Sequence, residues 1–291
     1  MIEQQLVNGL MLGSIYVLVA VAFTLTIGVL NFLNFSIPGI FMIGGMFTWA
    51  ALGAGVPWIP AIALVLLAGA AASLVVERFT YRWMRASDHF VPLVSSMAFL
   101  ILMENLVLNG WGSDLQRVAV PFPNVSVHVA GLIVSLPQLL GLAVTVALVC
   151  VLGVLLRRTR VGRGLRTIAE SPDTAIMLGV DIFKVVPVVF VISGLFTAFG
   201  GILFALNYQQ VQPFMGEEVA LKGISAMIVG GMGSIWGAVA GGLLIGIAEV
   251  ASIQLVGADF VDIVVYGLLL LILMVRPTGL FGAAALGKGK L

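Results

Sequence analysis

Long apolar runs separated by short polar stretches make up most of this sequence. Nine runs predict helices, at residues 6–30, 37–52, 58–76, 91–109, 136–156, 185–206, 221–234, 235–256 and 260–275. Runs of roughly twenty apolar residues match the hydrocarbon core of a bilayer, where a helix satisfies its own backbone hydrogen bonds. Continuous Leu, Val, Ala and Gly with little period-two alternation favours helices over a β-barrel. We therefore predict an all-α, polytopic transmembrane bundle of about eight or nine spans, with the run 221–234 short enough to stop partway across.

Composition agrees with a membrane protein, because 61% of the residues are hydrophobic, 9% are charged and mean hydropathy is +1.18. Soluble domains are about 25% charged. We expect residues 1–291 to form a single transmembrane domain with no separate soluble domain. The first apolar run lacks the basic start and the cleavage site of a signal peptide, so we expect it to be retained as a span. The lone Cys150 lies inside an apolar run, which excludes a disulfide framework.

Basic residues are divided unevenly between the two sides of the predicted bundle. In the nine-helix scheme, Arg117 and Lys222 fall on one side and the rest of the fourteen Lys and Arg residues on the other. The larger group consists of Arg78, Arg82, Arg85, Arg157, Arg158, Arg160, Arg163, Arg166, Lys184, Arg276, Lys288 and Lys290. Because Lys and Arg accumulate in cytoplasmic loops, we expect the N-terminus outside and the C-terminus in the cytoplasm.

One long polar segment, residues 157–184, separates the fifth and sixth runs, and we call it the island. Its sequence is RRTRVGRGLRTIAESPDTAIMLGVDIFK. Leu165, Ile168 and Ala169 share one face of a first short helix. Ser171, Pro172 and Asp173 are typical of the start of a second helix, as N-cap, first helical position and first-turn acid.

The second island helix is expected to carry a small apolar patch of Ala175, Ile176 and Leu178 and to end at Gly179. Two interpretations of the island remain open. It either docks on a cytoplasmic partner protein or lies on anionic lipid as a basic amphipathic helix. Small side chains such as those of Ala169 and Ala175 bury little area in lipid, which favours docking.

Glycine is abundant in the predicted spans, and three Gly-x3-Gly pairs place small residues on one helix face. The pairs are Gly9 with Gly13, Gly237 with Gly241, and Gly242 with Gly246. Close packing of helices explains them, and helices that slide during transport would need the same pattern.

Two carboxyl groups, those of Glu104 and Glu249, lie within apolar runs. A charge at mid-membrane costs on the order of 2.5–3.5 kcal/mol, so both groups are expected to face the interior, to pair or to be protonated. A structural hydrogen bond, a place on the translocation pathway and a proton relay remain open for them. Asn31 and Asn34, in the sequence NFLNFSIPG, belong either to a plain turn or to a gate.

The segment 282–288, GAAALGK, copies most of the P-loop spacing. Gly289 stands where a P-loop has Ser or Thr to bind magnesium, and no strand precedes the segment. No cluster with metal-ligand spacing and no Ser–His–Asp arrangement is evident. We therefore expect no catalytic, cofactor-binding or metal site in this chain, which is not predicted to be an enzyme. Any ATP must bind another polypeptide.

Several segments together resemble the permeases of ATP-binding cassette (ABC) importers for branched-chain amino acids. In the island, Gly162, Arg166, Ala175 and Gly179 match the spacing of the family's coupling segment, with Thr167 where Ala is usual. Further similar segments are LNFLNFSIPGIFMIGG at 30–45, ERFTYRWMR at 77–85, SAMIVGGMGSIWGAVAGGLLIGIAE at 225–249 and RPTGLFG at 276–282. The Trp after Arg82 departs from a common Pro. Because the segments span almost the whole chain, it is similar to the H-type subunits of this family.

The resemblance implies a subunit that moves branched-chain amino acids (Leu, Ile, Val) across a bacterial inner membrane by alternating access. It implies as partners a homologous permease chain, two ABC ATPase subunits that hold ATP and Mg, and an extracytoplasmic solute-binding protein, with membrane lipid and no nucleic acid. The implied ATPase-coupling residues are Gly162, Gly164, Arg166, Ala169, Glu170, Asp173, Ala175, Leu178 and Gly179. Relatives that carry amides, urea or simple sugars leave the solute open. An ion-coupled secondary transporter using Glu104 or Glu249 is the less favoured alternative.

Overall fold

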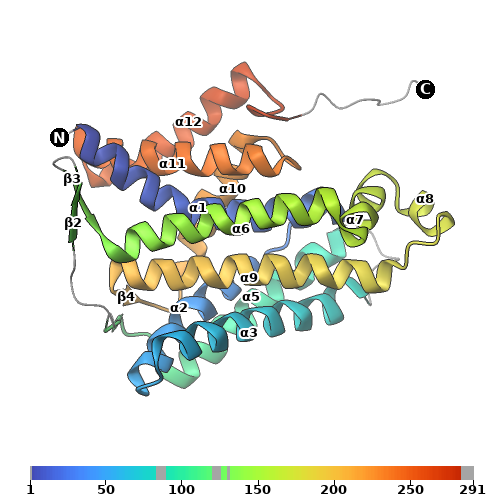
Figure 1. Ribbon diagram of the computed structural model, residues 1–291, viewed down its shortest axis with the longest axis horizontal. Coiled ribbons are helices and arrows are strands. Elements are labelled where there is room, and N and C mark those ends of the chain that lie inside the picture. Colours follow the sequence, from blue (N-terminus) through green and yellow to red (C-terminus); the bar gives the residue numbers. More distant parts are fainter. Residues whose placement is uncertain (1, 83–89, 120–125, 130–131, 283–291) are drawn as a thin grey trace.

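Every predicted apolar run forms a helix in the computed structural model, which describes residues 2–82, 90–119, 126–129 and 132–282 (Figure 1). The helices are α1 (Ile2–Leu30), α2 (Ile37–Gly53), α3 (Trp58–Val76), the π-helix η1 (Glu77–Tyr81), α5 (Phe90–Trp111), α6 (Leu136–Arg158), α7 (Arg160–Glu170), α8 (Pro172–Met177), α9 (Ile182–Tyr208), α10 (Met215–Gly230), α11 (Ile235–Leu255), the 3-10 helix η2 (Ala258–Phe260) and α12 (Val261–Val275). The strands are β1 (Gln116–Arg117), β2 (Ser126–Val129), β3 (Leu132–Ser135) and β4 (Gln210–Val211).

Within the described residues, 7 helices are long and apolar enough to cross a membrane. They are Glu3–Leu30, Trp58–Tyr81, Phe90–Trp111, Leu136–Arg158, Ile182–Tyr208, Ile235–Leu255 and Ala258–Val275. α2 and α10 are shorter, with 17 and 16 residues, and both pack inside the bundle. The prediction of an all-α polytopic bundle is confirmed.

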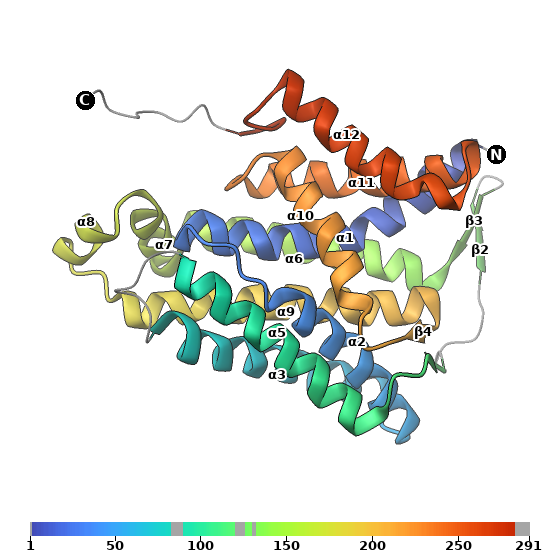
Figure 2. The ribbon, with the colours of Figure 1, turned by 180° about the vertical axis from the view of Figure 1, so that it is seen from behind.

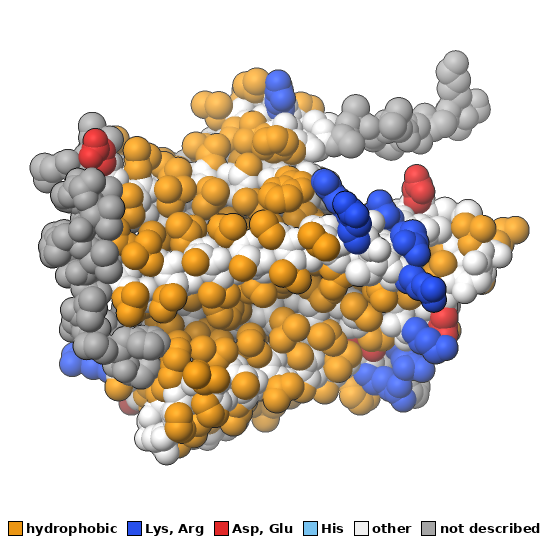
Figure 3. Space-filling model, viewed as in Figure 1, with side chains coloured by type: hydrophobic (Ala, Val, Ile, Leu, Met, Phe, Trp, Pro, Cys, Tyr) orange, Lys and Arg blue, Asp and Glu red, His pale blue; other side chains and the backbone are white. Residues whose placement is uncertain are grey.

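The bundle has two distinct ends. The hairpin of β2 and β3 lies at one end with the N-terminus, and α7 and α8 extend from the other (Figure 1). Figure 3 shows apolar side chains over the flank of the bundle and Lys and Arg gathered at the α7–α8 end. We call these the hairpin end and the island end.

The joint between α1 and α2 brings the chain back into the bundle before a new helix starts. Asn31 takes a left-handed backbone conformation at φ 57° and ends α1. The Asn34 side-chain oxygen accepts hydrogen bonds from the backbone N–H of Ser36, at 3.1 Å, and from its hydroxyl, at 2.8 Å. Ile37 and Pro38 then begin α2 in fully buried positions. Asn34 therefore organises the turn, and Ser36 occupies the N-cap position without a side-chain cap.

The predicted helix at 221–234 has different bounds in the structure, where α10 begins at Met215 and ends at Gly230. Seen from behind, α10 lies between α2 and α11 (Figure 2). Lys222 is consequently a residue of the helix middle with 3% exposure, and the nine-helix scheme was wrong to count it among the basic residues on the outer side.

The predicted glycine pairs lie where helices touch. A Cβ on Gly9 would be 2.7 Å from the Cα of Ile247, and one on Gly242 would be 2.7 Å from the backbone nitrogen of Val17. On the other side of α11, Gly237 and Gly241 face the backbone of α10. α11 thus packs closely against α1 on one side and α10 on the other. Both contacts require glycine, because a larger side chain there would push the backbones apart.

Two further connections tie distant parts of the chain. β1 pairs with β4, which joins the segment after α5 to the segment after α9. The backbone N–H groups of Leu280 and Phe281, beyond α12, donate to the carbonyls of Val229 and Gly230 at the end of α10, both at 2.9 Å. The P-loop-like segment lies outside the described residues apart from Gly282, as do Arg85, Lys288 and Lys290.

Candidate functional site

The base of the island is a tight reversal between α6 and α7. The Thr159 hydroxyl caps α7 by accepting from the N–H of Gly162 at 3.0 Å, and it donates to the carbonyl of Leu155 at 2.6 Å. A Cβ on Gly162 would lie 2.5 Å from that same carbonyl oxygen, so the reversal needs glycine here. Leu165 and Ile168 are 1% and 2% exposed, which anchors α7 against the spans. Gly162 therefore shapes the island, while the side chain of Arg166 on α7 is exposed.

α8 forms the tip of the island. It begins as predicted, since the Ser171 hydroxyl accepts from the N–H of Thr174 at 3.3 Å and Pro172 follows. Gly179 follows its end at φ 79°. Ala175 is fully buried, so the exposed apolar patch differs from the predicted one in that residue. The patch, which we call the apolar tip, consists of Ile176, Met177 and Leu178, at 51%, 87% and 70% exposure.

α9 starts beside the apolar tip with a charged cap. The Asp181 carboxylate accepts from the N–H of Phe183 at 3.1 Å and pairs with Lys184 at 3.1 Å. The hydrogen bond from Lys184 is the main reason that the pKa of Asp181 is lower than its ordinary value. This cap fixes where the island ends and the span begins.

The island and the α1–α2 joint share a cavity of about 600 Å³. Ala169, Glu170 and Asp173 line it from the island, and Asn31 lines it from the joint. Three of the predicted coupling residues and one predicted gate residue thus come together, although about 140 residues separate them in the sequence. Gly164 is buried on the opposite side of α7, near Val180 and Val185.

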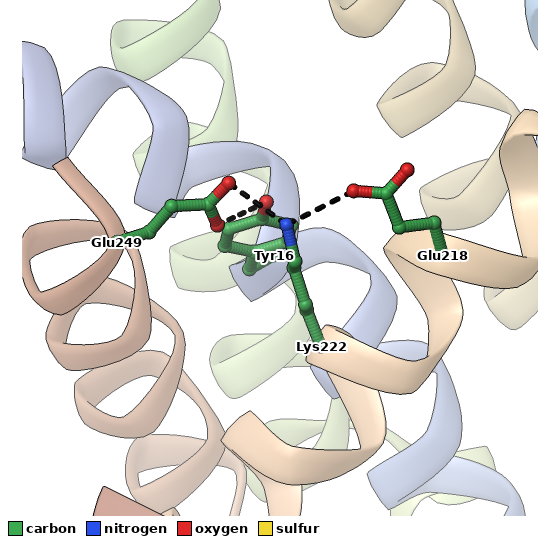
Figure 4. A network of polar contacts seen from close by, with 4 residues as sticks. All are labelled: Tyr16, Glu218, Lys222 and Glu249. Atoms are coloured by element: carbon green, nitrogen blue, oxygen red, sulfur yellow. Dashed lines mark hydrogen bonds and ion pairs between the residues drawn. The ribbon is translucent and has the colours of Figure 1, made fainter. Parts of the chain in front are cut away.

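Glu249 belongs to a buried polar cluster that joins three helices (Figure 4). The Tyr16 hydroxyl of α1 donates to one carboxylate oxygen at 2.6 Å, and Lys222 of α10 donates to the other at 2.8 Å. Lys222 also reaches Glu218 at 3.1 Å, whose side chain is 71% exposed. This geometry favours the structural interpretation of Glu249, because its charge is neutralised by a lysine within the bundle.

Glu104 and Asn34 lie apart from this cluster. Glu104 on α5 is 6% exposed and has no hydrogen bond or ion pair with any described residue. Asn105 beside it is exposed and donates to the carbonyl of Ile101 at 2.8 Å. The Asn34 side-chain nitrogen is buried without a partner. Both residues therefore have polar side-chain atoms inside the bundle that are free to bind another group. A residue that lines the translocation pathway or forms a gate needs such atoms.

Sequence reasoning missed Lys222 and Tyr16 as partners of Glu249. Lys222 follows Val219, Ala220 and Leu221, so a lysine in an apolar helix was itself a signal that a carboxylate lay opposite. Tyr16 gave no signal, because a tyrosine in an apolar run is common.

Comparison with known sequences identifies the family. The family described as "Branched-chain amino acid transport system / permease component" matches residues 5–273 of this chain. The chain belongs to this family. The high-affinity branched-chain amino acid transport system permease protein BraD of Pseudomonas aeruginosa is 32% identical over 298 residues, covering 98% of this chain and 97% of that protein.

Two further relatives of this permease component come from Escherichia coli. The high-affinity branched-chain amino acid transport system permease protein LivH is 31% identical over 306 residues, covering 98% of this chain and 97% of that protein. The L-arabinose transport system permease protein AraH is 35% identical over 133 residues, covering 44% of this chain and 40% of that protein. No solved structure matches the chain.

The family and the seven apolar helices together establish what kind of protein this is. The permease component is a multi-pass protein of the bacterial inner membrane. It is a transport subunit rather than an enzyme, and it works with the other subunits of an ABC transport system.

Proposed function

We propose that this permease moves branched-chain amino acids (Leu, Ile, Val) inward, driven by ATP hydrolysis on partner subunits. The solute assignment is supported by the two relatives named for branched-chain amino acids, which match almost the whole chain. The sugar permease matches less than half of it. Amides, urea and simple sugars are the competing solutes.

The proposed assembly contains a homologous permease chain, two ABC ATPase subunits with their ATP and Mg, and an extracytoplasmic solute-binding protein. In it the island end faces the cytoplasm, because the island arginines lie there with Arg82, which stacks on Phe183, whereas Arg117 lies in β1 beside β4 at the hairpin end (Figure 1). In the proposed orientation the N-terminus is outside and the C-terminus is in the cytoplasm.

The observation that carries the coupling proposal is the apolar tip on a rigid base. Ile176, Met177 and Leu178 are exposed to the side of the membrane where water is the solvent, which costs free energy unless a partner covers them. An apolar groove on an ATPase subunit fits such a tip, with Glu170, Asp173 and the island arginines around it.

Motion of the docked island would reach the spans through the shared cavity. Ala169, Glu170 and Asp173 face the α1–α2 joint across it, so a shift of α7 changes the surroundings of Asn31. Asn31 and Asn34 are then the gate residues, Glu104 a residue of the pathway, and Glu249 a fixed support beside it.

Reconstitution of the complex tests the function. The chain is co-expressed with the ATPase, permease and binding-protein genes that neighbour its own, and the purified complex is placed in proteoliposomes with ATP inside. We expect uptake of radiolabelled leucine that needs both ATP and the binding protein and that isoleucine and valine suppress. Suppression by an amide, urea or arabinose instead would reassign the solute.

The ion-coupled alternative is tested in the same vesicles. The purified chain alone, given a proton or sodium gradient and no ATPase subunits, should take up no leucine. Uptake under those conditions would refute the ABC assignment, whichever solute is carried.

A further inference from the structure

A second cavity at the island end lies between the spans and α7. Its volume is about 290 Å³, and its walls come from α1, α6, α7 and the first turn of α11. Most of the wall is apolar, with Leu25, Leu156 and Leu165 among its residues. The cavity adjoins the one at the α1–α2 joint, since Gly28, Val29 and Ala169 line both. Its apolar wall takes no part in the proposed docking of the apolar tip.

Two guanidinium groups stand at this cavity. Arg157 lies in the last turn of α6 and Arg166 lies on α7, and both side chains are exposed. Neither forms an ion pair with another residue in the part of the chain that the structure describes. Their donors are therefore available to an anion, and guanidinium groups bind phosphate through two parallel hydrogen bonds.

The start of α11 adds a third source of positive potential. Gly233, Ile235 and Trp236 line the cavity, so the first N–H groups of this 21-residue helix lie at its wall. Such N–H groups and the helix dipole attract anions.

We infer that this cavity binds an acidic phospholipid. The phosphate lies between Arg157, Arg166 and the start of α11, and an acyl chain follows the apolar wall between α6 and α11. Trp236, which is 50% exposed, sits where tryptophan anchors proteins at the membrane interface. The lipid joins α6, α7 and α11, and it holds the base of the island against the spans.

A lipid fits the cavity better than a free anion or a protein does. Inorganic phosphate would pair with the arginines but leave the apolar wall in contact with water. A lipid would pair its phosphate with the arginines and cover the apolar wall with an acyl chain. The walls are made by α1, α6, α7 and α11. The apolar tip offered to an ATPase subunit belongs to the end of the island that projects beyond the apolar flank (Figure 3). The inference goes beyond the proposed transport function, because lipid binding needs no ATPase.

Native mass spectrometry of the full chain in neutral detergent tests the inference by titration with phosphatidylglycerol. We expect a phosphatidylglycerol adduct at concentrations where phosphatidylcholine gives none. Arg157→Gln should weaken its affinity about fivefold, as expected for one basic residue near a lipid headgroup. Arg158→Gln is the matched control, because it removes the same charge from the neighbouring position and does not line the cavity.

Gly153→Leu gives a second test that leaves the charge unchanged. A Cβ at this position lies 3.8 Å from the Trp236 ring, so a leucine fits the backbone and enters the cavity. We expect the phosphatidylglycerol adduct to be lost while the melting temperature is kept.

Five outcomes would overturn the inference, and four of them come from the titrations. They are equal binding of phosphatidylcholine, equal weakening by Arg157→Gln and Arg158→Gln, displacement of the lipid by inorganic phosphate at equal concentration, and unchanged binding in both cavity variants. Loss of the lipid when the ATPase subunits assemble would assign the cavity to a protein contact and also contradict it.

Discussion

In the bundle interior, Lys222, Glu249 and Tyr16 bind one another, whereas in the island five arginines stand exposed without ion-pair partners among the described residues. The interior group lies among apolar helices, where an unpaired charge has no water to solvate it. The island group lies where water solvates every charge, so pairing adds little. Basic residues therefore serve two purposes in this chain, since Lys222 joins helices of the bundle and the island arginines stay available to other molecules.

Lys222→Met gives the largest expected effect, because it leaves the Glu249 carboxylate buried without its cation. Loss of one partner of a buried pair costs about 3–5 kcal/mol, measured as the free energy of unfolding in detergent. Glu218→Gln is the control, since it removes only the exposed partner of the same lysine and should cost no more than about 1 kcal/mol. The double variant Lys222→Met with Glu249→Leu should regain most of the loss. Equal costs for Lys222→Met and Glu218→Gln would mean that burial is not what distinguishes the two contacts.

Met177→Glu at the apolar tip should act on transport and spare the fold. The side chain is 87% exposed, so the melting temperature should stay unchanged. A charge placed in an apolar docking contact should lower ATP-driven leucine uptake about tenfold or more. Met177→Leu keeps the apolar contact and should transport normally. Normal uptake by Met177→Glu at equal expression would remove the apolar tip from the coupling proposal.

Ser171→Ala should loosen α8 alone. Loss of an N-cap costs about 1 kcal/mol, and this helix has only 6 residues to absorb it. We expect faster amide hydrogen exchange across residues 172–178 and no change in the spans, with Ser171→Asp as the control that restores a capping oxygen. Unchanged exchange in Ser171→Ala would show that packing of Ala175, and not the cap, holds α8.

Asp181→Asn should have the smallest effect, and that effect depends on pH. Because Lys184 lowers the pKa of Asp181 in the folded protein, its charge stabilises the fold above the unfolded pKa of about 3.9. That contribution is lost as pH falls through the folded value. The difference in melting temperature between wild type and variant should thus be constant from about pH 5 to 8 and shrink below about pH 4. A difference that grew on acidification would contradict this assignment.

The apolar pattern was sufficient to predict the bundle, because spans are defined by length and hydropathy. It also located the two island helices, since the cap at Ser171 and the glycine at Gly179 are local signals. It failed at the start of α10, where Glu217, Glu218 and Lys222 interrupt the apolar run. The predicted helix therefore began only at Leu221, after both glutamates. The tertiary contact with Glu249 is what makes the buried lysine tolerable there.

The predicted site residues also depend on tertiary contacts that the sequence does not show. The resemblance grouped Gly162, Ala175 and Leu178 among the ATPase-coupling residues, yet the first two are buried and serve the shape of the island. Small residues suit both a docking surface and a tight turn, so residue type alone cannot distinguish them. Asn31 lines the same cavity as Glu170 and Asp173 because of how the helices pack. A local sequence pattern cannot predict that arrangement.

The backbone hydrogen bonds from Leu280 and Phe281 to the end of α10 have a consequence for biosynthesis. The carbonyls of Val229 and Gly230 leave the ribosome well before the residues that satisfy them, because α11 and α12 must be made in between. These two hydrogen bonds at the corner between α10 and α11 can therefore form only after α12 has been synthesised. A released chain truncated after residue 275 should contain α10 and α11 but lack both bonds, so protease should cleave this corner faster than in the full chain.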